Sequence, residues 1–202
     1  MTAPPRRAAL KNEVRLIGGQ WKRSKLPVAD KPGLRPTPDR VRETLFNWLG
    51  QDLSGWRVLD AFAGSGALGF EAASRGAAEV LLLERDGELV ASLNATKLRL
   101  KADSVRIERA DAMAWLRRAN AAAFEAVLLD PPFDAGIGST ALAAALPLVV
   151  EGGYVYLEGP APVLDPPAGL EAFRQARAGA VHYQLFRRSY TAGVDASPRN
   201  PT

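Results

Sequence analysis

The sequence has no cysteine, a single histidine and no long apolar run among its 202 residues. Without cysteine the chain can form neither disulfides nor thiolate metal sites, and it carries no sign of secretion. One histidine cannot build a histidine-based metal centre, so we expect no metal and interpret His182 as structural. No segment approaches the roughly 20 apolar residues of a membrane-spanning helix, and the N-terminus lacks the apolar core of a signal peptide. We therefore expect a cytoplasmic protein without a membrane partner.

Charge is unevenly distributed along the chain. The net charge is +4, yet residues 1–42 carry 11 Lys and Arg against 3 Asp and Glu, whereas the remaining 160 residues carry 15 against 19. A basic segment in front of an acidic body predicts a polyanionic partner that the segment contacts. The alternative is a solvated basic tail without a partner.

Apolar runs and helical periodicities alternate from about residue 56 onward, which predicts a parallel sheet with helices on its faces. The expected strands are 57–61, 80–84, 105–109, 126–130 and 153–158, and the expected helices are 67–75, 86–100, 112–118 and 140–146. Two further alternating runs, 170–177 and 181–188, surround Gly179-Ala180 and predict a closing antiparallel hairpin. The fold class is therefore α/β.

The N-terminal part is different. Residues 14–28 alternate around Gly18-Gly19, which predicts a β-hairpin, followed by a linker rich in proline and glycine. Thr37 suits the N-cap of a helix and Pro38 its first position. We expect a disordered basic tail (1–13), a hairpin and linker that form a basic arm for a polyanionic partner (14–36), the main domain (37–191) and a disordered tail (192–202), in a monomer.

The sequence Asp130-Pro131-Pro132-Phe133 directly follows a buried apolar run. Proline cannot continue a central strand, so Asp130 should lie at a carboxyl strand end, where α/β sheets bind ligands. A carboxylate, the carbonyl of Pro131 and the ring of Phe133 together suit a planar ring that carries an amino group. We expect these three residues to be catalytic.

A glycine-rich turn, Gly64-x-Gly66-x-x-Gly69, joins the first expected strand to its helix and satisfies the dinucleotide fingerprint. Asp60 precedes this turn, however, and a carboxylate there repels a pyrophosphate and attracts the ammonium and sulfonium of S-adenosylmethionine. Glu84 ends the second strand and can accept from ribose hydroxyls, and Asp111 can accept from an adenine amino group. The predicted cofactor site therefore consists of Asp60, Ala61, Phe62, Gly64, Ser65, Gly66, Glu84, Arg85, Asp111, Ala112 and Asp130.

Four stretches, 17–21, 34–48, 62–69 and 130–133, together resemble the bacterial small-subunit ribosomal RNA methyltransferase D family. The resemblance covers about residues 14–190. It implies a Rossmann-like class I fold with a seven-stranded, mostly parallel sheet whose last strand is antiparallel, plus the N-terminal hairpin. It also implies methyl transfer from S-adenosylmethionine, with S-adenosylhomocysteine as product, to N2 of one guanosine in 16S ribosomal RNA. The substrate implied is an assembled or nearly assembled small subunit.

Basic residues of the arm and of the helix that follows are expected to bind the phosphates of this RNA. Trp21, among them, either stacks on a base or covers the hairpin, and we favour the covering role. The expected RNA-binding residues are Arg15, Trp21, Lys22, Arg23, Lys25, Arg35, Arg40 and Arg42.

Three alternatives stay open at this point. The same chemistry can act on another amino group, either adenine N6 in DNA or a protein glutamine, because the Asp130 motif does not exclude these. An NAD-dependent oxidoreductase is disfavoured by Asp60. A non-catalytic RNA-binding module is disfavoured because binding alone does not need Asp130 beside a cofactor turn.

Overall fold

A seven-stranded sheet forms the centre of the protein, with strand order β5-β4-β3-β6-β7-β9-β8. The computed structural model describes residues 13–29, 31, 37–132 and 136–190. The strands of this sheet are β3 (Arg57–Asp60), β4 (Glu79–Glu84), β5 (Val105–Arg109), β6 (Phe124–Leu129), β7 (Val149–Gly159), β8 (Leu170–Ala178) and β9 (Val181–Arg188). The helices are α1 (Asp39–Leu49), α2 (Ala67–Ser74), α3 (Gly87–Leu100), α4 (Ala112–Arg118) and α5 (Gly138–Ala145), the last followed by a 3-10 turn, η2 (Leu146–Leu148).

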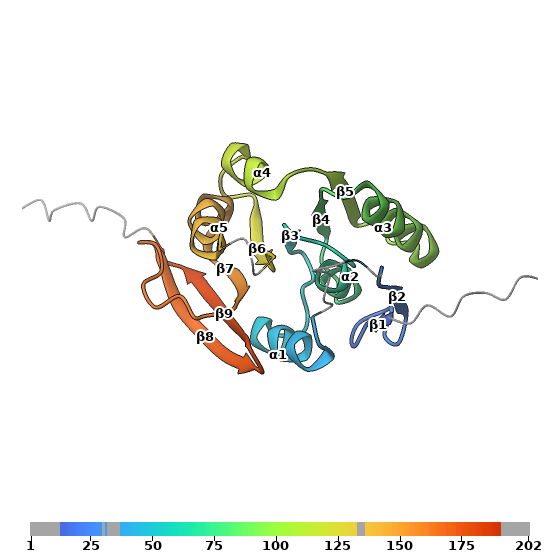
Figure 1. Ribbon diagram of the computed structural model, residues 1–202, viewed down its shortest axis with the longest axis horizontal. Helices are drawn as coiled ribbons and strands as arrows, with labels where there is room; N and C mark the ends of the chain where they lie inside the picture. The colour runs from blue at the N-terminus through green and yellow to red at the C-terminus, as the bar shows by residue number, and fades with distance from the viewer. Residues whose placement is uncertain (1–12, 30, 32–36, 133–135, 191–202) are drawn as a thin grey trace, which may run out of the picture.

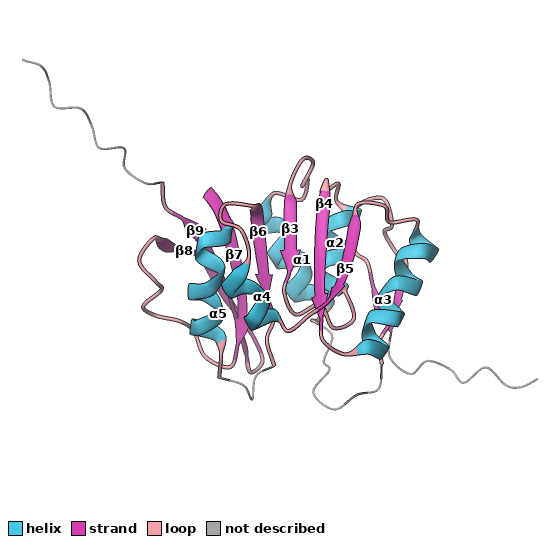
Figure 2. Cartoon of the chain, turned by 90° about the horizontal axis from the view of Figure 1, so that it is seen from above, coloured by secondary structure: helices cyan, strands magenta, loops and turns pink. Residues whose placement is uncertain are grey.

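Strands β3 to β7 run parallel, and β9 lies antiparallel between β7 and β8. The predicted sheet, including its antiparallel last strand and the closing hairpin, is thus confirmed. The carboxyl ends of the parallel strands share one edge, which faces the viewer in Figure 1 and lies at the bottom of Figure 2. Side chains just beyond these strand ends are therefore brought together.

Two helical layers cover the sheet, with α1, α2 and α3 on one face and α4 and α5 on the other (Figure 1). The apolar run before Asp130 is almost fully buried, as expected for a strand covered on both faces. Every residue of α2 is buried, because this helix lies between the sheet and the N-terminal segment. Among the described residues, no helix combines the length and apolarity that a bilayer crossing requires.

The N-terminal hairpin pairs β1 (Glu13–Arg15) with β2 (Lys25–Pro27), so the predicted hairpin is confirmed with a longer connection than expected. It is not a free arm, because its connecting turn binds the end of α2. The amide of Trp21 donates to Oγ of Ser74 at 2.9 Å, and that hydroxyl donates to the carbonyl of Gly18 at 2.6 Å. A Cβ at Gly19 would lie 1.7 Å from the carbonyl oxygen of Ser74, so only glycine permits this approach.

Helix α1 begins one residue later than predicted. Pro38 is its N-cap and Asp39 its first residue, and no side chain caps it. The assignment of Thr37 as N-cap was therefore wrong. The Thr37 hydroxyl instead donates to Oδ2 of Asp130 at 3.2 Å. The local sequence pattern predicted that Thr37 caps the helix, but its hydroxyl bonds to Asp130 at the edge of the sheet instead.

Candidate active site

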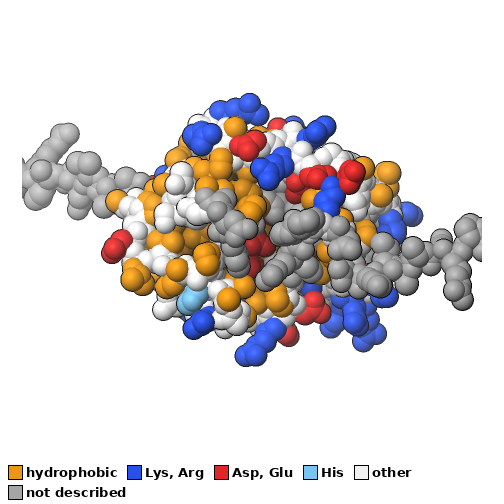
Figure 3. All heavy atoms as spheres, viewed as in Figure 1, with side chains coloured by type: hydrophobic (Ala, Val, Ile, Leu, Met, Phe, Trp, Pro, Cys, Tyr) orange, Lys and Arg blue, Asp and Glu red, His pale blue; other side chains and the backbone are white. Residues whose placement is uncertain are grey.

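Four carboxyl groups meet at the carboxyl edge of the sheet. Asp60 ends β3 and pairs in register with Leu82 and Leu128, so Glu84 and Asp130 each lie two residues beyond it on the neighbouring strands. Glu158, near the end of β7, completes the group beside Asp130. Figure 3 shows acidic side chains near the middle of this face and Lys and Arg around its rim. The edge is thus built for a ligand that is cationic and rich in donors.

The glycine turn between β3 and α2 is held by two of these carboxylates. The amide of Gly64 donates to Oε2 of Glu84, and the amide of Gly69 donates to Oδ2 of Asp60, both at 2.9 Å. Gly66 adopts φ +77°, and a Cβ there would also collide with Phe70. Two amide donors of the turn therefore face carboxylates, which leaves the turn poorly suited to a pyrophosphate.

Asp60 is 1% exposed, and among the described residues its Oδ1 has no hydrogen-bond partner. Burial raises the pKa of Asp60 to about 7; the amide of Gly69 opposes this rise and the charge of Asp130 adds to it. A buried acceptor without a donor costs free energy, and a cationic ligand removes that cost when it binds. This orphaned oxygen fits the cationic groups of S-adenosylmethionine.

The remaining predicted cofactor residues lie at or just beyond the carboxyl ends of β3, β4 and β5. Glu84 uses its second oxygen to accept from the amide of Asp86 at 2.8 Å, so each of its oxygens has one donor and can accept a further hydrogen bond. Asp111 caps α4 by accepting from the amide of Ala114, while Ala112 is buried behind it. In the turn itself Ala61 is buried and Phe62, Gly64 and Ser65 are partly exposed; beyond β4, Arg85 is exposed.

Asp130 lies directly after β6, with Pro131 buried beside it. Burial raises the pKa of Asp130 to about 6, and the hydrogen bond from Thr37 opposes that rise. Asp130 is therefore ionised at neutral pH and can accept an N–H. Phe133, the third predicted catalytic residue, lies outside the described residues.

Glu158 was missing from the predicted site. Its side chain is 3% exposed, and Oε1 accepts from the hydroxyl of buried Tyr156 at 2.8 Å. Burial, together with the charge of Asp130, raises the pKa of Glu158 to about 8. One signal was available in the sequence, because Glu158 ends an apolar strand in the same manner as Glu84.

The predicted RNA-binding residues divide into four groups. The predicted RNA-binding role of Arg42 is wrong. This residue is 0% exposed, and its guanidinium contacts Glu71 and Asp39 rather than solvent. Trp21 packs partly buried against the core, as the covering role requires. Arg35 lies outside the described residues. The exposed members are Arg15, Lys22, Arg23, Lys25 and Arg40.

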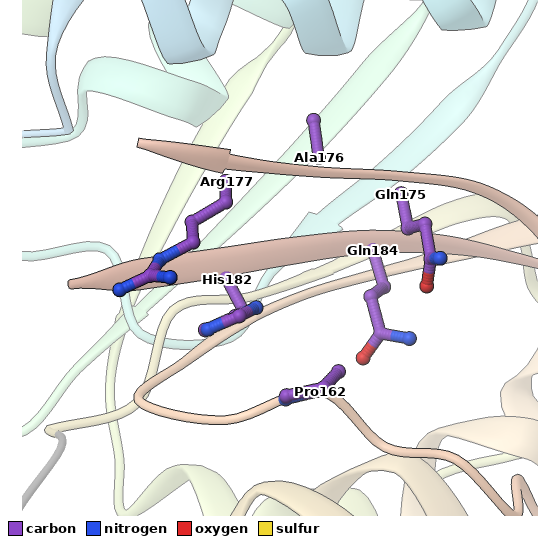
Figure 4. Close-up of a pocket in the computed structure, with 6 residues that line it drawn as sticks. All are labelled: Pro162, Gln175, Ala176, Arg177, His182 and Gln184. Carbon is purple, nitrogen blue, oxygen red and sulfur yellow. The ribbon is translucent and has the colours of Figure 1, made fainter. Parts of the chain in front are cut away.

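His182 lines a groove of about 330 Å³ between the β8–β9 hairpin and the loop after β7 (Figure 4). The groove also contains Pro162, Gln175, Arg177 and Gln184. The Gln184 amide is already bonded to both backbone groups of Val163. Gln184 therefore holds the loop after β7 against the β8–β9 hairpin, and His182 lies beside this structural contact.

A sequence model of the family described as "Conserved hypothetical protein 95" matches residues 14–187. This chain belongs to that family. It is 41% identical over 192 residues to the "Ribosomal RNA small subunit methyltransferase D" of Escherichia coli strain K12, covering 91% of this chain and 94% of the relative. The enzyme of that name from Haemophilus influenzae is 37% identical, over 88% of this chain and 95% of the relative. The predicted family resemblance is confirmed.

Similar solved structures share this architecture. A putative methyltransferase from Escherichia coli, yhhF, matches with a TM-score of 0.79 and 37% identity, covering 88% of this chain and 99% of that one. A putative methylase from Haemophilus influenzae, HI0767, gives a TM-score of 0.76 and 32% identity, covering 89% of this chain and all of that one, 100%. The predicted class I methyltransferase fold is therefore confirmed.

Proposed function

We propose that this protein transfers the methyl group of S-adenosylmethionine to N2 of one guanosine in 16S ribosomal RNA, within an assembled or nearly assembled small subunit. The observation that carries the proposal is Asp130, an ionisable acceptor followed by two prolines and set beside a glycine turn lined with carboxylates. The similar proteins of Escherichia coli and Haemophilus influenzae are named ribosomal RNA small subunit methyltransferases, and this supports the substrate class.

The glycine turn and its carboxylates bind the methyl donor in this proposal. Asp60 attracts its cationic part, Glu84 accepts from the ribose and Asp111 from the adenine. When bound, S-adenosylmethionine supplies an electrophilic methyl group on a positively charged sulfur. An NAD-dependent reaction is disfavoured because Gly64 and Gly69 already donate to carboxylates, where a dinucleotide would bring more negative charge.

Asp130 and the Pro131 carbonyl orient the target amino group. The lone pair of guanine N2 is delocalised into the ring, so the nitrogen is a poor nucleophile. Accepting both N–H groups favours the pyramidal form of the nitrogen and frees its lone pair towards the methyl group. We expect Phe133 to stack on the ring, which requires an unstacked target base and favours a loop nucleotide.

The proton released after transfer needs only a weak base. An amino nitrogen that has gained a methyl group is cationic and strongly acidic, so it loses a proton readily to Asp130 or to water. A carboxyl with a pKa of about 6 is ionised at neutral pH and can take that proton.

Mass spectrometry of ribosomal RNA from cells with and without this gene tests the proposal. We expect one N2-methylguanosine to disappear from 16S ribosomal RNA when the gene is removed and to return when it is restored. An unchanged 16S ribosomal RNA, or loss of a methylated adenine in DNA or of a methylated glutamine in protein, would overturn it. Those losses correspond to the same chemistry on another amino group.

A further inference from the structure

Glu158 and Asp130 are neighbours on one face of the sheet. In the parallel β6–β7 pair Leu129 is in register with Leu157, so the next residues of the two strands are Asp130 and Glu158. Alternation along each strand places both carboxyls on the face that α1 covers, where Leu128 and Tyr156 belong to one core cluster. The two acids are therefore adjacent across a strand pair rather than on opposite faces.

Thr37 acts on both acids. Its hydroxyl donates to Oδ2 of Asp130 at 3.2 Å. The same hydroxyl lies within reach of Glu158 and lowers the pKa of that acid when it donates to the ionised form instead. A hydroxyl has one hydrogen to donate and two lone pairs with which to accept. While Thr37 donates to Asp130, it can only accept from Glu158, which requires Glu158 to carry a proton.

No cation neutralises this pair among the groups that act on Glu158 in the described part of the chain. Those groups are Thr37 before α1, Asp60 of β3, Asp130 of β6 and Tyr156 of β7 itself; Tyr183 of β9 lies opposite Glu158 in register. Arg42 of α1 donates to the Thr37 carbonyl, but its charge is directed to Glu71 and Asp39. Neighbouring acids without a cation do not both ionise readily.

Tyr156 occupies one oxygen of Glu158. Its hydroxyl donates to Oε1 of Glu158 at 2.8 Å, and its own pKa is raised well above the usual value by burial and by the charge of Glu158. Tyr156 thus remains a donor throughout the physiological pH range. Glu158 is left with its other oxygen to hold a proton.

We propose that Glu158 is a positioning residue for the methyl-transfer step: it keeps a proton, donates it towards Thr37, and so leaves the Thr37 hydroxyl free to orient an ionised Asp130. This inference rests on the proposed function. The proton released by the methylated amino nitrogen passes to the Asp130 carboxylate and then to water, while Glu158 retains its own. When Glu158 ionises, it competes for the Thr37 hydrogen, and Asp130 loses its orientation.

The test compares the pH dependence of kcat for the wild type, Glu158→Gln and Tyr156→Phe on small subunits. Because the pKa of Glu158 is about 8, wild-type kcat should fall about tenfold per pH unit above that value. Glutamine is a permanent stand-in for the protonated acid. Glu158→Gln should therefore stay within about threefold of wild type near neutral pH and lack this fall. Because the target base titrates equally in all three reactions, only differences between the three pH profiles of kcat report on Glu158.

Tyr156→Phe gives an independent result if Glu158→Gln does not fold. The Tyr156 hydrogen bond lowers the pKa of Glu158, so its removal should move the fall in kcat to higher pH. Glu79→Gln, an exposed acid on β4, is the matched control and should leave the profile unchanged.

Two results would overturn the inference. One is an identical profile for wild type, Glu158→Gln and Tyr156→Phe. The other is a Glu158→Gln protein that binds S-adenosylmethionine but has lost most of its activity near neutral pH, which would mean that the ionised acid is needed. A wild type that methylates no ribosomal RNA would instead refute the proposed function, so the two failures can be told apart.

Discussion

The hydroxyl of Thr37 lies 3.2 Å from Oδ2 of Asp130, although 93 residues separate them in sequence. The contact joins the residue just before α1 to the acid at the end of β6. Because Thr37 also acts on Glu158, the segment that follows the basic hairpin ends at the centre of the candidate site. The described N-terminal residues therefore belong to the same structural unit as the acidic edge.

Replacing Asp60 with asparagine should stabilise the ligand-free protein at alkaline pH. The pKa of Asp60 is raised from 3.8 to about 7 in the folded protein. Protonated Asp60 therefore contributes fully to stability below pH 3.8, and this contribution is lost as the pH rises through about 7. We expect Asp60→Asn to exceed wild type in free energy of unfolding by on the order of 2–4 kcal/mol at about pH 8. Urea unfolding at several pH values measures this difference.

The same variant should bind S-adenosylmethionine more weakly, because the charge that attracts the cationic ligand is gone. Calorimetry on both proteins provides that comparison. A variant no more stable than wild type under alkaline conditions would show that Asp60 is not strained by its charge. Unchanged binding of S-adenosylmethionine would remove Asp60 from the cofactor site.

The exposed basic residues of the hairpin turn should control the salt dependence of RNA binding. Changing Lys22 and Arg23 together to alanine removes two phosphate contacts, which should lower the slope of log affinity against log salt by about 2. Filter binding of small subunits over a salt series gives the slope. Arg117→Ala with Arg118→Ala, at the exposed end of α4, is the control. If both double variants show the same slope of log affinity against log salt, the hairpin turn does not contribute specifically to RNA binding.

Glu71 should be a centre of stability for the N-terminal segment. It is fully buried and accepts from the amide of Ile17 at 2.8 Å, from Arg75 at 2.8 Å and from Arg42 at 3.4 Å. Glu71→Ala removes the ion-pair partner of Arg75 and leaves buried Arg42 with Asp39 as its one acidic partner among the described residues, which should cost about 3–5 kcal/mol of unfolding free energy. Chemical denaturation measures it, with exposed Glu43→Ala as control. A loss below about 1 kcal/mol would show that the packing of α2 suffices without this acid.

The sheet and the position of Asp130 followed from local patterns. Apolar runs such as 127–129, ended by prolines, predict a buried strand and its carboxyl end with little dependence on distant residues. The glycine turn is equally local, because Gly66 needs a positive φ wherever the sequence occurs. These features fix the acidic edge before any tertiary contact is known.

Arg42, Thr37 and Glu158 could not be placed correctly in this way. Each takes its role from a partner far along the chain: Arg42 from Glu71 on another helix, and Thr37 from Asp130. An arginine near a helix start is usually exposed, so only the buried Glu71 reveals its actual role. Glu158 is functional in our proposal because of its neighbour on β6, which sequence periodicity does not identify.

Transfer of labelled methyl groups to small subunits from cells that lack this gene, by wild type and by Asp130→Ala, tests the central claim most directly. We expect the wild type to deliver one methyl group per subunit. Nucleoside analysis should identify it as N2-methylguanosine. Asp130→Ala should bind S-adenosylmethionine yet transfer at least about 100-fold more slowly. Full activity of Asp130→Ala, or a label on any other nucleoside, would contradict this account.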